Sequence, residues 1–272
     1  MSDWGSFESL AARYNFLNTP PFGQVFMEVV VDEARRRGSA CRILDVGCGA
    51  GIGRDVQLQW VIKNAAEELW GIEPDSEVTV ANDLFDHFQY ALMETAELPA
   101  DHFDIAYSSM VMEHVADPGA FLAAVHRCLK PGGVYLFVTP NAQSFVPWAT
   151  KVLHAARLDE FMLRLIRGRK EVEEYHYPVQ FRCNLPKQLS RYAEATDFLP
   201  PEYAYLEGRG VHGYLRGALA PLRHLLTWKR RLVRTPSRLA TLICRMTKPH
   251  HDGPQQNPRP SDSGASNRRD TA

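Results

Sequence analysis

The chain has 272 residues, 45% of them hydrophobic, and a formal net charge of −1 from 31 basic and 32 acidic side chains. This length accommodates one domain of about 200 residues with appendages, and the hydrophobic content fits a globular core. A charge this close to zero excludes a global electrostatic affinity for nucleic acid. The five cysteines are dispersed, without a Cys-x-x-Cys pair or a metal-type cluster, which favours a reduced, cytoplasmic location.

The first residues predict a helical lead-in rather than a targeting segment. The opening MSDWGSFESL lacks a basic flank followed by an apolar stretch, and no run in the chain approaches the roughly 18 apolar residues that a membrane span needs. Residues 1–38 carry apolar side chains at helical spacing, and three arginines followed by Gly38 predict the end of the helix.

The most informative stretch is Ile43–Arg54, with the sequence ILDVGCGAGIGR. Its apolar first residues predict a buried parallel strand, and Asp45 lies near the exit of that strand. Four alternating glycines follow, which let the backbone approach a ligand closely. A dinucleotide fingerprint requires glycine at the sixth position from Gly47, where this chain has Ile52. The turn therefore predicts a nucleotide-like cofactor other than a nicotinamide dinucleotide.

Strands and helices are predicted to alternate after this turn. Leu69–Ile72 form a second apolar strand that ends at Glu73, whose carboxylate is placed to accept from ribose hydroxyls. A third strand is predicted near Tyr90–Met93, a fourth in FDIAYSSM, and a fifth after a helix end and a Pro-Gly-Gly turn in LKPGGVYLFVTPN. A helix from about Pro186 and a late strand, EYAYLEG, follow. This order predicts a doubly wound α/β fold.

Four motifs in residues 22–206 resemble, in order, the Rossmann-like class I S-adenosylmethionine-dependent methyltransferases. The resemblance implies a seven-stranded, mainly parallel sheet, S-adenosylmethionine as the cofactor, and transfer of its methyl group. It also implies contacts to the methionine part, the ribose and the adenine of the cofactor. These are Asp45, Gly47, Cys48, Gly49 and Gly51 for the methionine part, Glu73 for the ribose, and Thr95 and Ala96 near the adenine. Threonine stands at 95 where the family often has an acid.

The candidate catalytic residues are Glu113 and His114, directly after the fourth strand, and His176. An imidazole or carboxylate there is suited to remove a proton from a hydroxyl acceptor. The pair is similar to ubiquinone-pathway O-methyltransferases and small-RNA 2′-O-methyltransferases, whose metal-binding members use two glutamates and two histidines. Met110 occupies the first of these positions, and a thioether is a poor ligand for a hard cation, so we expect no metal. The structural alternative is that Glu113 and His114 only cap the next helix and hydrogen-bond the loop, and that His176 only packs.

The predicted organisation is a methyltransferase domain over 39–207, in which 142–175 is an insertion that shapes the substrate pocket. Residues 208–249 hold ten Lys and Arg, no Asp or Glu, and interleaved leucines, which predicts a basic amphipathic helical extension. Three explanations fit this extension: it packs on the domain, it lies on an anionic membrane surface, or, least favoured, it binds nucleic acid. The polar residues 250–272 are expected to be disordered.

The sequence therefore predicts an enzyme that O-methylates a small-molecule, glycan or lipid-linked acceptor. Two alternatives from other classes stay open. One is a catalytically silent cofactor-binding regulator or partner subunit, favoured by Thr95 and Met110. The other is a peripheral membrane protein that uses its basic C-terminal helices at the inner membrane surface.

Overall fold

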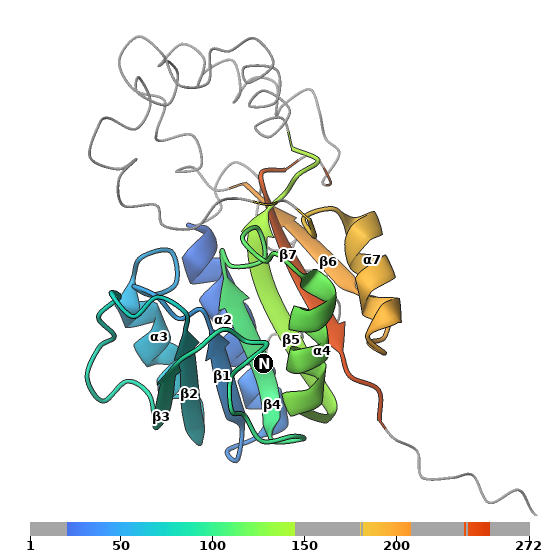
Figure 1. Cartoon of the computed structure of the whole chain (residues 1–272). Coiled ribbons are helices and arrows are strands. Elements are labelled where there is room, and N and C mark those ends of the chain that lie inside the picture. Colours follow the sequence, from blue (N-terminus) through green and yellow to red (C-terminus); the bar gives the residue numbers. More distant parts are fainter. Residues whose placement is uncertain (1–20, 145–179, 181, 208–236, 238, 251–272) are drawn as a thin grey trace, which may run out of the picture.

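The structure is a computed structural model that describes residues 21–144, 180, 182–207, 237 and 239–250 (Figure 1). Its described strands form one sheet in the order β3-β2-β1-β4-β5-β7-β6, and β7 runs antiparallel to both of its neighbours. The strands are β1 (Arg42–Val46), β2 (Glu68–Glu73), β3 (His87–Tyr90), β4 (Phe103–Ser109), β5 (Leu129–Pro140), β6 (Glu202–Leu206) and β7 (Thr241–Thr247). The predicted seven-stranded, mainly parallel sheet is confirmed.

Helices cover both faces of the sheet. The described helices are α2 (Phe22–Arg37), α3 (Val56–Lys63), α4 (Pro118–Cys128) and α7 (Pro186–Ala195). One buried cluster joins α2 and α3 to the sheet, and the other joins α4 and α7 to its opposite face. Figure 1 shows α2 behind the sheet and α4 in front of it. Strand β1 serves both clusters, since Ile43 packs toward α2 while Leu44 and Val46 pack toward α4, which explains its uninterrupted apolar sequence.

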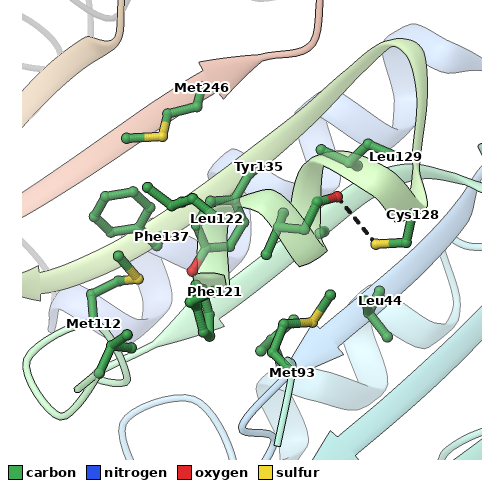
Figure 2. Close-up of a cluster of buried hydrophobic side chains, with 14 of the residues drawn as sticks. Leu44, Met93, Met112, Phe121, Leu122, Cys128, Leu129, Tyr135, Phe137 and Met246 are labelled. Atoms are coloured by element: carbon green, nitrogen blue, oxygen red, sulfur yellow. Dashed lines mark hydrogen bonds between the residues drawn. The ribbon is translucent and has the colours of Figure 1, made fainter. Parts of the chain in front are cut away.

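The core on the α4 side is built from large side chains of three elements. Figure 2 shows Phe121 and Leu122 of α4 packed near Tyr135 and Phe137 of β5, with Met246 of β7 beyond them. All five are buried to 3% exposure or less. Burial of this kind contributes about 1.5–3 kcal/mol for each large side chain, so this layer holds β5 and β7 firmly against α4.

The glycine turn lies at the point where the order of the strands reverses, between β1 and β4. Strand β1 pairs with β2 on one side and β4 on the other, both parallel, so the segments after these strands meet at one edge of the sheet. In open α/β sheets ligands bind at this edge, outside the carboxyl ends of the strands. We call it the carboxyl edge.

The C-terminal part of the predicted helical extension is a strand. Residues Thr241–Thr247 lie between β5 and β6, although 208–249 was predicted as helical. Leu242 and Ile243, which the pattern placed on an amphipathic helix face, are fully buried in the sheet. The prediction failed here because a short run of apolar residues has the same appearance in a buried strand and in a helix.

The charges at the end of β7 also serve the fold. Arg245 donates to Glu202 at 2.7 Å, and Lys248, 5% exposed, donates to Asp101 at 2.7 Å. The Lys248 ammonium also donates to the backbone oxygens of His126 and Leu129. These two cations are therefore engaged within the protein. No helix in the described part of the chain is long and apolar enough to cross a membrane.

Two further boundaries differ from the sequence prediction. Strand β3 ends at Tyr90, where the predicted strand began. The prediction was displaced because this edge strand is only partly buried and its apolar pattern is weak. The Pro-Gly-Gly segment lies inside β5 rather than before it, with Gly132 at φ 77° and a register shift against β4. The predicted ends of α2 at Gly38 and the start of α7 at Pro186 are confirmed. Residues 1–20, most of the 142–175 insertion, 208–236 and 251–272 lie outside the described residues.

Candidate functional site

The turn after β1 is held against β2 by its backbone. The amides of Gly47 and Cys48 both donate to the carbonyl oxygen of Ile72, at 2.8 and 3.1 Å. Gly47 has φ 68°, and a Cβ there would lie 2.6 Å from the Val111 side chain. Gly51 has φ 102°, and a Cβ there would lie 2.5 Å from the backbone at Asp55. Only glycine fits these two positions of the turn, hereafter the glycine loop (residues 47–53), because a side chain there would collide with neighbouring protein atoms.

Glu73 at the end of β2 closes the other side of the loop. Its Oε2 accepts from the Gly49 amide at 2.7 Å, and its Oε1 accepts from the Asp75 amide at 3.0 Å. The residue is 6% exposed, and burial raises the pKa of its carboxyl group. Each carboxylate oxygen has a second lone pair, so both can still accept from a pair of ligand hydroxyls. The structure thus brings Glu73 and the glycine loop together as the sequence predicted.

Asp45 lies beneath the loop rather than on its surface. Its Oδ2 accepts from the Tyr107 hydroxyl at 2.6 Å and from Gln59 Nε2 at 2.7 Å. Gln59 also donates to the carbonyl oxygen of Cys48 at 2.9 Å, which ties the loop to α3. Sequence reasoning missed the roles of Gln59 and Tyr107, because each lies on a separate element and meets Asp45 only in the fold. Cys48 is 3% exposed and burial raises the pKa of its thiol.

The buried carboxyl group of Asp45 predicts a pH-dependent stability. Burial raises its pKa from 3.8 to about 7, so the folded state binds a proton more tightly than the unfolded state, and this group's contribution falls as pH rises from about 4 to about 7. Asp45→Asn removes the charge that is buried at high pH. We expect the variant to gain at least about 3 °C in Tm at pH 8 relative to its change at pH 5, measured by calorimetry against the parent chain. An equal change in Tm at both values of pH contradicts this assignment.

The segment after β3 holds the predicted adenine contacts. Thr95 Oγ1 donates to the carbonyl oxygen of Leu92 at 3.3 Å, and Ala96 is buried. Glu94, one residue earlier, is exposed and carries a carboxylate, which position 95 lacks. Sequence reasoning missed Glu94 because it placed the third strand over Tyr90–Met93. With the strand ending at Tyr90, Glu94 becomes the first acid after it.

Glu113 and His114 follow β4 at the carboxyl edge, in a turn closed by a 2.8 Å hydrogen bond from the His114 amide to the Val111 carbonyl oxygen. Glu113 is 3% exposed, and its Oε2 accepts from the Thr139 hydroxyl at 2.9 Å. Burial raises the pKa of Glu113 to about 7. His114 is half-buried. Val111, at the start of the same turn, packs against Gly47 of the glycine loop. Glu113 and His114 therefore lie near that loop.

The capping part of the structural alternative is wrong, since neither Glu113 nor His114 is the N-cap residue of α4. Asp117 is the N-cap of α4, and its carboxylate accepts from the amides of Gly119 and Ala120 at 3.0 and 3.1 Å. Thr139 contacts Glu113 directly, and Asn184 contacts Thr139. Sequence reasoning missed both residues, because no local pattern links strand β5 to the segment before α7.

Met110 is held in a left-handed conformation with φ 58°, and its amide donates to the Val138 carbonyl oxygen at 2.9 Å. A non-glycine residue with positive φ is uncommon, and such strain clusters at functional sites. Among the residues that the structure describes, no group of three or more His, Cys, Asp or Glu side chains is placed to hold a metal ion. His176 lies outside the described residues.

Comparison with known proteins gives this site a family. The family model described as "Methyltransferase domain" matches residues 13–198, which is more than half of the chain. The chain is 31% identical over 147 residues to a Mycolicibacterium smegmatis protein named "Probable S-adenosylmethionine-dependent methyltransferase". This match covers 50% of the chain and 55% of that protein. It is 30% identical over 153 residues to the ubiquinone biosynthesis O-methyltransferase of Rhodopseudomonas palustris, covering 54% of the chain and 57% of that protein.

The chain thus spans about half the length of the curated relatives it matches. Among solved structures, a geranyl diphosphate methyltransferase in complex with GPP and sinefungin superposes with a TM-score of 0.54 at 12% identity, covering 82% of this chain and 77% of that one. This likeness shows the fold. The cofactor that goes with this family and fold is S-adenosylmethionine, and the geometry of the glycine loop and Glu73 fits it. The chain belongs to the methyltransferase-domain family.

Proposed function

We propose that this chain transfers the methyl group of S-adenosylmethionine to a hydroxyl oxygen of a small acceptor. One observation carries the proposal: the glycine loop, Glu73 and the turn after β4 converge on one edge of the sheet. The Gly49 amide joins the loop to Glu73 at 2.7 Å. Fold alone does not define an activity, so the assignment rests on the chemistry of these side chains.

The cofactor, when bound, supplies a methyl group activated by a sulfonium sulfur. The glycine loop accommodates the methionine part against bare backbone, and Glu73 accepts from the ribose hydroxyls. Glu94 accepts from the adenine amino group, with Thr95 and Ala96 beside it. Asp45 does not need to touch the ligand, because it acts by holding the loop in place through Gln59.

Methyl transfer to a hydroxyl requires alignment of the acceptor and removal of one proton. His114 is our candidate base, since imidazole takes up protons near neutral pH and the turn after β4 fixes its position. With the cofactor bound, its sulfonium would supply the methyl group to the acceptor oxygen, and the imidazole nitrogen of His114 would take up the hydroxyl proton. Glu113 is directed toward Thr139, so we assign it a supporting role.

An oxygen acceptor is supported by several relatives named ubiquinone biosynthesis O-methyltransferase. Those names favour oxygen as the methylated atom, and small-molecule, glycan and lipid-linked acceptors all stay open. The deciding experiment incubates the full chain and methyl-labelled S-adenosylmethionine with fractionated cell extract, and then with 3,4-dihydroxybenzoate, a sugar and a lipid extract. Label on a hydroxyl oxygen of an acceptor supports the proposal. Label on nitrogen or carbon contradicts it.

Activity is expected to survive metal chelators. Met110 presents a thioether where a hard cation needs an oxygen ligand, and a preorganised pocket aligns donor and acceptor without a metal. The measurement compares transfer rates before and after dialysis against EDTA, with a magnesium-dependent methyltransferase treated in parallel. If activity is lost and returns with Mg²⁺, Mn²⁺ or Zn²⁺, the interpretation of Met110 is wrong.

Each of the two alternative functions has its own test, the first of which is the same labelling assay. A silent regulator or partner subunit binds S-adenosylhomocysteine, the demethylated cofactor, but releases no labelled product from any fraction. For a peripheral membrane role, liposome sedimentation with and without anionic lipid is the test. Arg245 and Lys248 are engaged inside the fold, so such binding has to use other cations of the C-terminal region.

A further inference from the structure

The chain that returns to the fold before α7 is fastened to the turn after β4. The Gln180 amide donates to the Glu113 carbonyl oxygen at 2.7 Å. The Cys183 thiol lies 3.2 Å from the Met112 carbonyl oxygen and donates to it. These contacts link residues about 70 positions apart in the sequence, and they hold the turn from two points along its length.

The same returning segment is fastened to the end of β5. Asn184 Nδ2 donates to Thr139 Oγ1 at 2.5 Å and to the Pro140 carbonyl oxygen at 3.2 Å. In the other direction, the Ala142 amide donates to the Asn184 carbonyl oxygen at 3.2 Å. Asn184 and Thr139 are both fully buried, so water does not compete for these bonds.

The direction of this hydrogen-bond chain is fixed by chemistry. A carbonyl oxygen only accepts, so the Pro140 contact requires Asn184 to present its amino group. That group donates to the Thr139 oxygen, and the Thr139 proton is then free to point only toward Glu113, 2.9 Å away. Asn184 thus orients the Thr139 hydroxyl, and the hydroxyl orients the Glu113 carboxylate.

The hydrogen-bond chain from Asn184 through Thr139 to Glu113 has a cost in stability. Asn184 Oδ1 is buried without a hydrogen-bond partner in the described structure. A buried unsatisfied oxygen destabilises the folded state, and an apolar residue of the same size avoids this cost. The titratable groups that act on Glu113 or respond to it are Tyr135 on β5 and Cys183, both kept neutral because burial raises the pKa of each. Because Asn184 leaves an oxygen buried without a partner, packing alone does not explain an asparagine at this position.

We propose that Thr139 and Asn184 are positioning residues of the methyl-transfer site, which act through Glu113 to fix the turn after β4 that carries His114. This inference rests on the proposed function, because the position of the turn matters for catalysis only where the acceptor binds beside it. The physical link itself, from Asn184 to the turn, is independent of any activity.

The test is hydrogen exchange, read by mass spectrometry, on the full chain without cofactor. Thr139→Val is isosteric and removes the hydroxyl. Thr139→Ser keeps it. Loss of one hydrogen bond to a carboxylate raises local exchange about tenfold in residues 111–116, while the glycine loop exchanges as before. The matched control is Thr241→Val, the same substitution at a buried position on neighbouring β7, which leaves exchange in 111–116 unchanged.

Thr139→Ser is expected to restore exchange in 111–116 to within about threefold of the parent chain, a rescue that a purely volume-based effect does not produce. Asn184→Leu, near-isosteric and without a donor, is a second variant that loosens the same residues. Affinity for S-adenosylhomocysteine, measured by calorimetry, stays within about twofold in Thr139→Val. The proposal is overturned if Thr139→Val matches the Thr241→Val control, or if the glycine loop loosens equally. A parent chain that binds no S-adenosylhomocysteine contradicts the proposed function instead.

Discussion

Glu73→Ala is expected to weaken binding of S-adenosylhomocysteine by at least about thirtyfold. The variant removes both acceptors for the ribose hydroxyls, and losing such a pair of hydrogen bonds costs about 2 kcal/mol. It also leaves the Gly49 amide without the carboxylate that holds it at 2.7 Å, so the loss of affinity is expected to exceed that from the ligand contacts alone. Titration calorimetry on the full chain measures the effect.

Two variants make this result specific. Glu77→Ala removes an exposed carboxylate four residues further on and is expected to leave the affinity unchanged. Gly49→Val, at φ 44°, strains the loop directly and is expected to abolish measurable binding while the circular dichroism spectrum stays that of the parent. Unaltered affinity in both Glu73→Ala and Gly49→Val contradicts the assignment of the cofactor site.

The cofactor half of the site could be predicted because its signals are local. Ile43–Arg54 is contiguous, and Glu73 follows a short buried strand that pairs with β1 in register. Buried parallel strands and glycine turns leave strong patterns over a few residues. The contact between Gly49 and Glu73 then follows from topology, since the ends of adjacent parallel strands meet at one edge.

The methyl-transfer half could be predicted only in part. The position of Glu113 and His114 after β4 was readable, but the direction of the Glu113 side chain depends on Thr139 and Asn184, 26 and 71 positions away. Asn184 comes from a segment that returns to the sheet after a long excursion. A single sequence carries no signal for such a pairing, because neither residue type nor spacing specifies the partner.

Strand β7 shows a second limit. Leu242 and Ile243 continue a leucine-rich basic region, and their spacing fits a helix as well as a strand. The decision depends on a vacant position between β5 and β6, where a strand satisfies the backbone groups of both neighbours. Tertiary context therefore decides this segment, and with it the ion pairs of Arg245 and Lys248.

His114→Ala is expected to lower kcat by about a hundredfold with little change in cofactor affinity. General-base help typically contributes 10²- to 10⁴-fold, and the lower value fits a hydroxyl that is already acidic, such as a phenol. The turn that holds His114 is closed by the 2.8 Å bond to Val111 and tied to Gln180 through Glu113, so the backbone that carries the imidazole is held at the carboxyl edge. The measurement is steady-state transfer of labelled methyl to the acceptor that the extract assay identifies.

The comparison with two other histidines decides the role. His176→Ala is expected to raise the acceptor KM rather than lower kcat, since His176 directly follows the predicted pocket insertion, 142–175. His87→Ala, an exposed histidine on β3, serves as the matched control and is expected to leave both constants unchanged. If His176→Ala abolishes turnover while His114→Ala keeps it, the base is His176. If neither variant alters kcat, the acceptor ionises without an enzymatic base, and the turn after β4 serves alignment alone.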